Sequence, residues 1–300
     1  MSSAPSEAAV GFIGLGVMGE AMCANIVRRG PSPVIAYDLD PGPVARLAEA
    51  GARPAASAAE VGEAASVVLL SLPAAEHVQQ VVLGDDGLLA VSKPGQVIVD
   101  LGTSGVGPTR ELARTCAERG VTFCDAPVAR TRAAAVAGKL SVMVGGDEET
   151  FGSLRPLLEC IATDITHCGP VGSGQLAKLM NNIVLFTEVL ALSEAAVVAE
   201  RNGMSREALF GILAKGSADS FALRNHGRAI AADSYPEAAF PTSYAAKDAS
   251  YALRLAAEAG VDARAFALVH DTLRRTIDAG FAAEYFPVLA RVVAQGEAKD

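Results

Sequence analysis

The chain has 300 residues, 51% hydrophobic and 20% charged, with 25 basic and 34 acidic side chains that give a net charge of −9. This length is enough for two domains, each with its own hydrophobic core. The acidic balance and the lack of a basic run argue against binding to the phosphates of nucleic acid. The five cysteines and four histidines show no spacing typical of metal ligands, so we expect no metal site.

The sequence also carries signals about the compartment of the protein. The first nine residues have neither the positive charge nor the apolar run of a secretion signal, and we expect a loose tail there. The longest apolar stretch, residues 183–199, contains Glu188 and Glu194, which argues against a membrane span. An odd number of scattered cysteines fits a reducing compartment. We therefore expect a cytoplasmic protein.

The first half of the chain alternates short β-rich runs with segments of helical length. Six strands are predicted, at residues 10–13, 33–37, 66–70, 96–100, 122–125 and 140–144. Several of these runs are apolar at every position, as in strands that are buried on both faces of a parallel sheet. Alternation of strands and helices predicts an α/β fold with a doubly wound parallel sheet.

The pattern changes close to residue 170. Residues 175–201 contain neither glycine nor proline and predict one helix of about seven turns. Further helices are predicted near residues 205–215, 218–231, 244–259, 263–278 and 285–295. We therefore expect a nucleotide-binding domain over residues 1–170 and an all-helical domain for substrate binding and dimerisation over residues 171–300.

A glycine-rich motif follows directly on the first predicted strand. It reads Gly14-Leu15-Gly16-Val17-Met18-Gly19, which is G-x-G-x-x-G. The first glycine permits a tight turn, the second lets the backbone approach a pyrophosphate, and the third lets the helix pack on the strand. Asp38 ends the second strand, where a carboxylate can bind ribose hydroxyls and would repel a 2′-phosphate. The motif predicts dinucleotide binding, with NAD favoured over NADP.

The long helix carries polar side chains inside an apolar segment. Lys178 and Asn182 are four residues apart and share one face, and Asn181 lies beside them. Such groups need a polar cavity or partners, because buried unpaired polar groups are costly. The alternative is a lysine that reaches solvent from the helix edge, with asparagines bonded to a neighbouring loop.

Five motifs in this order resemble the β-hydroxyacid dehydrogenase family, whose best-known members act on 3-hydroxyisobutyrate. They are the first glycine motif, Asp100-Leu101-Gly102-Thr103, Asp125-Ala126-Pro127-Val128, Lys178 with Asn181 and Asn182, and Lys247-Asp248. The resemblance covers nearly the whole chain. It implies a Rossmann domain, a helical domain on a long connecting helix, and NAD(P)-dependent oxidation of a 3-hydroxy acid or the reverse reduction.

The resemblance also implies roles for single residues. Lys178 would be the catalytic lysine, and Asn182 its partner. Thr103 would lie near the nicotinamide, and Lys247 where cofactor and substrate meet. Leu72-Pro73 matches a loop beside the cofactor.

The chain departs from the family pattern at one loop. Many members have Ser-Gly-Gly where this chain has Ala129-Arg130-Thr131, so a hydroxyl and two glycines are lost and a guanidinium is gained. Arginine presents a planar donor fork suited to oxyanions. The loop is similar to that of sulfolactaldehyde reductases, although Leu185 stands where those enzymes keep a polar residue. The alternative for Arg130 is a solvated loop side chain. We count these three residues and Asn181 as candidate substrate-binding residues.

The motifs together predict an NAD-dependent dehydrogenase or reductase for a short 3-hydroxy acid or its semialdehyde, with Lys178 as general acid and base. The substrate is expected to be a small anion, either a carboxylate or a sulfonate. The alternatives are an imine reductase, against which Lys178 counts, and a non-catalytic module that senses NAD(H). The long apolar helix must cover its surface, which predicts a homodimer or homotetramer.

Overall fold

The computed structural model describes residues 9–237 and 239–296. Most of the expected N-terminal tail lies outside this range, but its last residue, Ala9, already belongs to the first strand. The chain forms two compact units, residues 1–178 and 179–300. The roles that the sequence assigns to two domains stay predictions.

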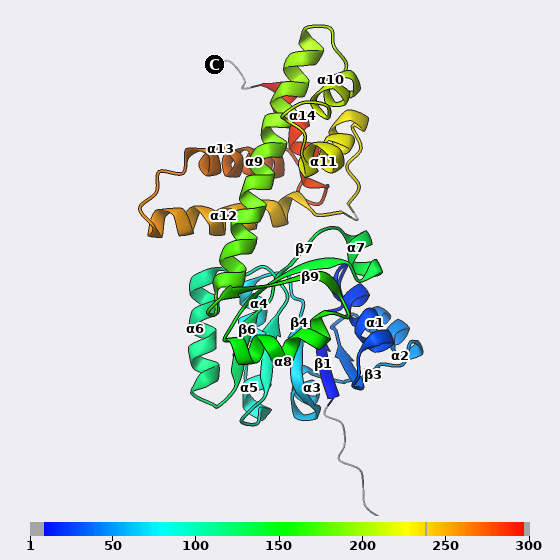
Figure 1. Cartoon of the computed structure of the whole chain (residues 1–300), viewed down its shortest axis with the longest axis vertical. Helices are drawn as coiled ribbons and strands as arrows, with labels where there is room; N and C mark the ends of the chain where they lie inside the picture. Colours follow the sequence, from blue (N-terminus) through cyan, green and yellow to red (C-terminus); the bar gives the residue numbers. More distant parts are fainter. Residues whose placement is uncertain (1–8, 238, 297–300) are drawn as a thin grey trace, which may run out of the picture. The chain divides into compact units, whose positions relative to one another are not determined.

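The first unit is built on one mixed sheet (Figure 1). Its strands are β1 (Ala9–Ile13), β2 (Val34–Tyr37), β3 (Arg53–Pro54), β4 (Ala65–Leu70), β5 (Val97–Asp100), β6 (Thr122–Asp125), β7 (Val128–Ala129), β8 (Leu140–Gly145) and β9 (Ala162–Gly169). They lie in the order β3-β2-β1-β4-β5-β6-β8-β7, and β9 pairs with β8. The six strands from β3 to β6 are parallel, and their order is that of a doubly wound dinucleotide-binding sheet.

Helices cover both faces of this sheet. They are α1 (Gly19–Arg29), α2 (Pro41–Glu49), α3 (Ala58–Ala64), α4 (Ala75–Leu83), α5 (Leu88–Val91), α6 (Val106–Ala117), α7 (Arg132–Ala137) and α8 (Glu148–Leu158). The core on one face joins Phe12 of β1 to α1, α2, α7 and α8, and the core on the other face joins Ile13 to α3, α4, α5 and α6. Successive residues of one strand thus enter opposite cores, which explains the continuous apolar runs in the sequence.

The structure differs from the predicted sheet in two respects. The six predicted strands are present, but β3, β7 and β9 were not predicted. The sheet is also not wholly parallel, because β8 runs antiparallel to β6 and β7. A parallel pair needs a long crossover connection. The only helix between β6 and β8 is α7, whose six residues span about 9 Å.

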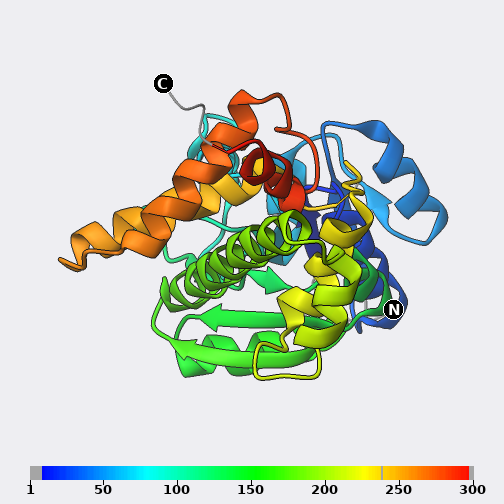
Figure 2. The same cartoon turned by 90° about the horizontal axis from the view of Figure 1, so that it is seen from above.

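The second unit consists of helices and their connecting turns, with an isolated antiparallel bridge between Pro241 and Tyr285 and no strand among its described residues. It holds most of α9 (Ser173–Arg201), then α10 (Arg206–Leu213), α11 (Phe221–Ala232), α12 (Thr242–Glu258), α13 (Arg264–Asp278), the 3₁₀ turn η1 (Phe286–Val288) and α14 (Leu289–Gln295). Figures 1 and 2 show α12 and α13 side by side. The core gathers Ile183 and Phe186 of α9 with residues of α11, α12 and α13. The predicted helices are therefore confirmed, with ends that differ by a few residues.

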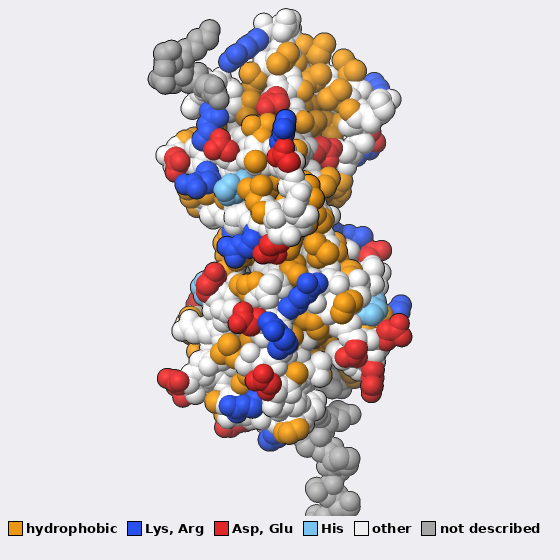
Figure 3. Space-filling view, turned by 90° about the vertical axis from the view of Figure 1, so that its left-hand side faces the viewer, with side chains coloured by type: hydrophobic (Ala, Val, Ile, Leu, Met, Phe, Trp, Pro, Cys, Tyr) orange, Lys and Arg blue, Asp and Glu red, His pale blue; other side chains and the backbone are white. Residues whose placement is uncertain are grey.

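Helix α9 is long and apolar enough to cross a membrane by length and composition alone. Half of its most apolar window is buried in the protein, and a core helix passes the same test. Some apolar side chains of the helical unit remain at the surface, and Figure 3 shows hydrophobic groups gathered there. They include Val184, Val198, Ile212, Phe221 and Leu268, each more than half exposed. The predicted homo-oligomer would cover such a surface, and it stays a prediction.

Candidate active site

The glycine motif lies where the strand order of the sheet reverses, between β1 and β4. Gly14 has φ +93°, and a Cβ atom there would lie 2.4 Å from the carbonyl oxygen of Ser71. A Cβ on Gly19 would lie 2.0 Å from the carbonyl oxygen of Gly14. A Cβ on Gly16 would meet no heavy atom of the described residues within 4 Å. The loop therefore needs its first and third glycines for packing, and it leaves open space at the second.

This geometry fits a bound pyrophosphate. The open space at Gly16 lets an anion approach the backbone, and the positive end of α1 favours a negative charge. Among the described residues, no side chain caps the first turn of α1, whose N-cap residue is Met18. Leu15 is buried and the side chain of Val17 is exposed.

Asp38 follows β2 and is tied to the glycine loop. Its Oδ2 accepts a hydrogen bond from the backbone N–H of Leu15 at 2.5 Å, and its Oδ1 accepts from that of Asp40 at 2.8 Å. A carboxylate offers about four acceptor positions, so two bonds leave room for ribose hydroxyls. Arg46 on α2 is the arginine closest to Asp38 in the sequence. It donates to Glu20 of α1 at 2.6 and 2.9 Å, so its guanidinium is already bonded within the protein.

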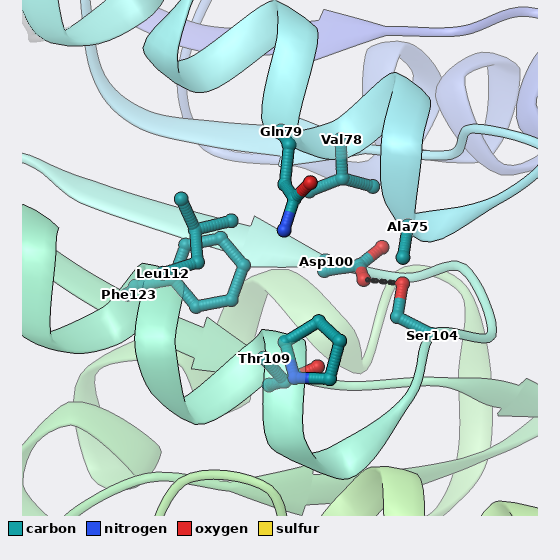
Figure 4. A pocket seen from close by; sticks show the side chains of 9 residues that line it. Ala75, Val78, Gln79, Asp100, Ser104, Thr109, Leu112 and Phe123 are labelled. Carbon is teal, nitrogen blue, oxygen red and sulfur yellow. Dashed lines mark hydrogen bonds between the residues drawn. The ribbon is translucent and has the colours of Figure 1, made fainter. Parts of the chain in front are cut away.

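Three further predicted cofactor-binding residues lie in loops at the same edge of the sheet. Leu72 and Pro73 follow β4, and Thr103 follows β5. Next to them, Ser104 donates its hydroxyl hydrogen to Asp100 at 2.8 Å (Figure 4). The hollow beside this pair has a volume of only about 10 Å³. It is too small for anything larger than a water molecule, so it is not a substrate site.

The three substrate-loop residues have defined places in the first unit. Ala129 is buried in β7 and pairs with Ser141 of β8. The hydroxyl oxygen of Thr131 caps α7 by accepting from the backbone N–H of Ala134 at 3.3 Å. Ala129 thus offers no hydroxyl in place of the serine that this chain lacks, whereas the cap uses the Thr131 hydroxyl only as an acceptor and leaves its O–H to donate.

Arg130 has an unusual backbone and a set of partners within the protein. Its φ is +88°, a conformation that favours glycine. Its guanidinium donates to Lys139 O at 2.7 Å, to Thr163 Oγ1 at 3.0 Å and to Asp164 Oδ2 at 2.6 Å. Two of its five N–H groups, on Nε and Nη2, make no such bond with the described residues. The side chain braces the loop against β9, and the remaining fork is the part that an anion could use.

The polar residues of α9 have different environments. Lys178 is half-buried, Asn181 is exposed and Asn182 is buried. Asn182 donates to Asp248 Oδ2 of α12 at 2.7 Å and accepts from Asn181 Nδ2 at 3.1 Å. The amide of Asn182 is therefore oriented by a buried carboxylate.

Lys247 is placed by the same carboxylate. Its Nζ lies 3.3 Å from Asp248 Oδ1 and is 5.9 and 5.4 Å from the ring centres of Tyr244 and Tyr251. Both tyrosines lie within one helical turn of Lys247 on α12, so the ammonium is flanked by two aromatic faces. Asp248 thus links Lys247 to Asn182 within the helical unit.

Asp248, Tyr244 and Tyr251 were not among the predicted site residues. Asp248 stood in a quoted motif, and an acidic residue next to a motif lysine was the available signal. Asp125 and Gln175 were not among the predicted site residues either, although Asp125 stood in a quoted motif, and both prove to be buried. Their signal was an acidic residue at the end of a buried strand and a glutamine at the start of the long helix.

Known families match nearly the whole chain. Residues 9–169 match the model of the NAD binding domain of 6-phosphogluconate dehydrogenase. Residues 172–292 match the model described as the NAD-binding domain of NADP-dependent 3-hydroxyisobutyrate dehydrogenase.

Individual relatives agree with these matches. The chain is 39% identical over 216 residues to a probable mitochondrial 3-hydroxyisobutyrate dehydrogenase of Dictyostelium discoideum, covering 72% of this chain and 67% of the relative. It is 38% identical over 214 residues to an NAD-dependent L-serine dehydrogenase of Pseudomonas aeruginosa, covering 71% and 72%. The structure of 3-hydroxyisobutyrate dehydrogenase of Mycobacterium tuberculosis with L-serine superposes with a TM-score of 0.86 at 31% identity, covering 96% of this chain and 99% of the other.

The fold, the glycine loop and these matches together identify the chain as a member of the β-hydroxyacid dehydrogenase family. It is an NAD-binding oxidoreductase of the hydroxyacid dehydrogenase type. The resemblance expected from the five motifs is confirmed, as are the fold class and the cofactor.

Proposed function

We propose that this protein transfers a hydride between NAD and the hydroxyl-bearing C3 of a short 3-hydroxy acid, with Lys178 as general acid and base. The observation that carries the proposal is the place of Lys178 in the chain. It is a half-buried lysine one turn into α9, and α9 begins directly after the sheet that holds the glycine loop. 3-Hydroxyisobutyrate is the first candidate substrate and L-serine the second, because relatives are named for them.

NAD, when bound, accepts or donates the hydride at its nicotinamide ring. As the hydride leaves C3 of the hydroxy acid, positive character develops there, and loss of the hydroxyl proton relieves it. The amine of Lys178 takes this proton in oxidation and returns it to the developing alkoxide in reduction. Asn182 lies one turn further on the same helix and adds no competing charge.

A carboxylate is the anion that we propose for the substrate. The relatives reported above are named for 3-hydroxyisobutyrate and L-serine, which are both carboxylates. Three of the five N–H groups of Arg130 are already bonded to residues of this protein. The remaining Nε and Nη2 fork can hold a carboxylate oxygen, with Asn181 as a further candidate contact.

The Dictyostelium relative is named as a mitochondrial enzyme, so the cytoplasmic location also stays a prediction.

The test is NADH-dependent reduction of a panel of carboxylated, sulfonated and uncharged aldehydes and a cyclic imine. We expect turnover of a carboxylated semialdehyde, and a fall in kcat of about 10²–10⁴ in Lys178→Ala. NADH affinity, followed by its fluorescence, should change less than about threefold, which is under 1 kcal/mol. Lys93→Ala, which changes an exposed lysine of the same unit shortly before β5, serves as the control.

Other results would favour the alternatives. Turnover of the imine that survives Lys178→Ala would indicate an imine reductase. Tight NADH binding without turnover of any compound would indicate a sensing module. Near-normal semialdehyde reduction by Lys178→Ala would remove the lysine from the mechanism.

A further inference from the structure

The start of α9 is held by a carboxylate from a distant part of the chain. Asp125 ends β6 and is fully buried. Its Oδ1 accepts from the backbone N–H of Gly172 at 2.6 Å, and its Oδ2 accepts from that of Gln175 at 2.8 Å. A helix leaves its first N–H groups without partners in the helix, and acidic groups stabilise its N-terminus. Asp125 therefore caps α9 from 47 to 50 residues away.

The side chain of Gln175 makes a second attachment. Its Oε1 accepts from the backbone N–H of Ser104 at 3.0 Å, and its Nε2 donates to Gly102 O at 3.0 Å and Asp100 Oδ2 at 3.4 Å. Asp100 is itself bonded to Ser104 (Figure 4). The first turn of α9 is therefore tied to the carboxyl ends of both β5 and β6.

Close packing limits any other position of this turn. A Cβ atom on Gly174 would lie 2.2 Å from Met143 O and 2.9 Å from Asp125 Oδ2. Lys178 follows Gln175 by three residues, less than one helical turn and about 4.5 Å along the axis. The backbone position of Lys178 is thus determined by the attachment of Gln175.

We propose that Asp125 and Gln175 are positioning residues for Lys178, and that they fix the helix turn from which its amine acts. The inference rests on the proposed function of Lys178. A fully buried carboxylate is costly unless its bonds compensate. Desolvation raises the pKa of Asp125 to about 6, against the backbone N–H groups of Gly172, Gln175 and Asp125 itself, which lower it. The group is therefore ionised at neutral pH, in the form that accepts both bonds.

The test uses Asp125→Asn in the full-length protein. The new amide would present N–H groups to a backbone N–H, so one of the two bonds is lost without a change of volume. We expect kcat to fall about 10–100-fold, the effect of misplacing a catalytic group by about 1 Å. The KM for NAD and the affinity for NADH should stay within about threefold, because the glycine loop is untouched.

A matched control is available in the same unit. Asp147 caps α8 by accepting from Thr150 N at 2.7 Å and from its hydroxyl at 2.9 Å. Asp147→Asn makes the same chemical change at a helix start that carries none of the predicted site residues, and it should leave kcat unchanged. Gln175→Met breaks the second attachment alone and should also lower kcat. If circular dichroism shows that Asp125→Asn does not fold, Gln175→Met still tests the positioning role.

Double variants with Lys178→Ala separate this inference from the proposed function. If the residues act through Lys178, then Asp125→Asn and Gln175→Met should lower kcat no further in the Lys178→Ala background. Normal kcat in both single variants, with Lys178→Ala inactive, would overturn the positioning role and leave the proposed function standing. If Asp125→Asn and Gln175→Met lowered kcat by the same factor in the wild-type and Lys178→Ala backgrounds, the positioning role would also be overturned. Near-normal activity of Lys178→Ala would overturn both.

Discussion

Asn182 of α9 and Asp248 of α12 share a buried hydrogen bond, with 2.7 Å between Nδ2 and Oδ2. Both side chains are more than nine-tenths buried. In Asp248→Ala the amide of Asn182 loses its acceptor, and a buried unsatisfied group costs about 1–3 kcal/mol. We expect the free energy of unfolding, measured with urea, to fall by that amount. Asp262→Ala breaks an exposed pair with Arg264 and should change it by less than about 1 kcal/mol. Equal effects would show that the Asn182 bond adds nothing.

Asp38 should make the enzyme prefer NAD to NADP. Its carboxylate follows β2 next to Leu39, which is 89% exposed. Asp38→Asn with Leu39→Arg removes the negative charge and adds a partner for a 2′-phosphate, and it should move the ratio of kcat/KM toward NADP by about 10–100-fold. The measurement is kcat/KM with each cofactor. A wild-type enzyme that is more efficient with NADP would contradict the assignment of Asp38.

Arg130 allows anion binding and loop bracing to be separated. If its remaining fork holds the substrate anion, Arg130→Ala should lower kcat/KM for a charged semialdehyde by about 10–150-fold, the value of a charge-assisted hydrogen bond. The kcat/KM for an uncharged aldehyde should be nearly the same in Arg130→Ala and wild type. Asp164→Ala removes one of the three bonds that brace Arg130 but keeps the guanidinium, and it should change kcat/KM little for either substrate. Comparable losses in the two variants would assign Arg130 to bracing alone.

Gly174 and Gly152 form a matched pair for the packing of α9. A Cβ on Gly174 has no room, so Gly174→Ala should destabilise the protein by about 1–3 kcal/mol or more. Gly152 lies inside α8, where a Cβ would meet no heavy atom of the described chain within 4 Å. Gly152→Ala should therefore stabilise by about 0.5–1 kcal/mol. Thermal unfolding measures the stability of both variants. A Gly174→Ala variant as stable as wild type would contradict the close packing of the first turn of α9.

Asp125 should give the unfolding free energy a specific pH dependence. Burial raises its pKa to about 6 in the folded protein, so between about pH 4 and 6 the native state binds the proton more tightly than the unfolded chain. The contribution of Asp125 to stability is therefore complete below about pH 4 and is lost as the pH rises through about 6. Asp125→Asn lacks this titration. The difference in unfolding free energy, wild type minus variant, should fall by on the order of 2–3 kcal/mol across that range.

The neighbours of Asp125 keep this difference interpretable. Asp100 is the nearby charge that adds to the shift. Cys124 and Cys168 also lie close, and their thiols have pKa values raised mainly by burial, so they stay protonated throughout. A flat difference between pH 4 and 6 would show that Asp125 titrates outside this range.

The fold could be predicted from local sequence patterns, namely the apolar runs and the glycine motif. Val68 and Leu69 of β4 enter opposite cores, and this burial on both faces is visible as an unbroken apolar run. The glycine motif could be recognised because Gly14 and Gly19 meet steric needs of one short loop and Gly16 leaves space for an anion beside the backbone. Strand β9 was missed because Thr163, Asp164 and Thr166 are exposed and interrupt the apolar pattern.

Only those site residues that belong to local motifs could be predicted, and the contacts between distant residues could not. Lys178 and Asn182 could be placed on one helix face, but the bond from Asn182 to Asp248 joins residues 66 apart. The same holds for Asp125 with Gln175 and for Arg130 with Asp164, since no local period links them. The left-handed backbone of Arg130 had one signal, which was the departure of this loop from the Ser-Gly-Gly pattern that the sequence resembles elsewhere.

The two ends of the sheet bear on how the protein behaves at high concentration. At one end β3 has only two residues, and the second, Pro54, has no N–H to offer. At the other end, the exposed residues of β9 include the charged Asp164, which is held by Arg130. Short strands, prolines and charges are the features that prevent the edges of separate sheets from joining. Within the described residues, neither end of the sheet offers a long apolar edge, so we expect the folded protein to resist aggregation by strand addition.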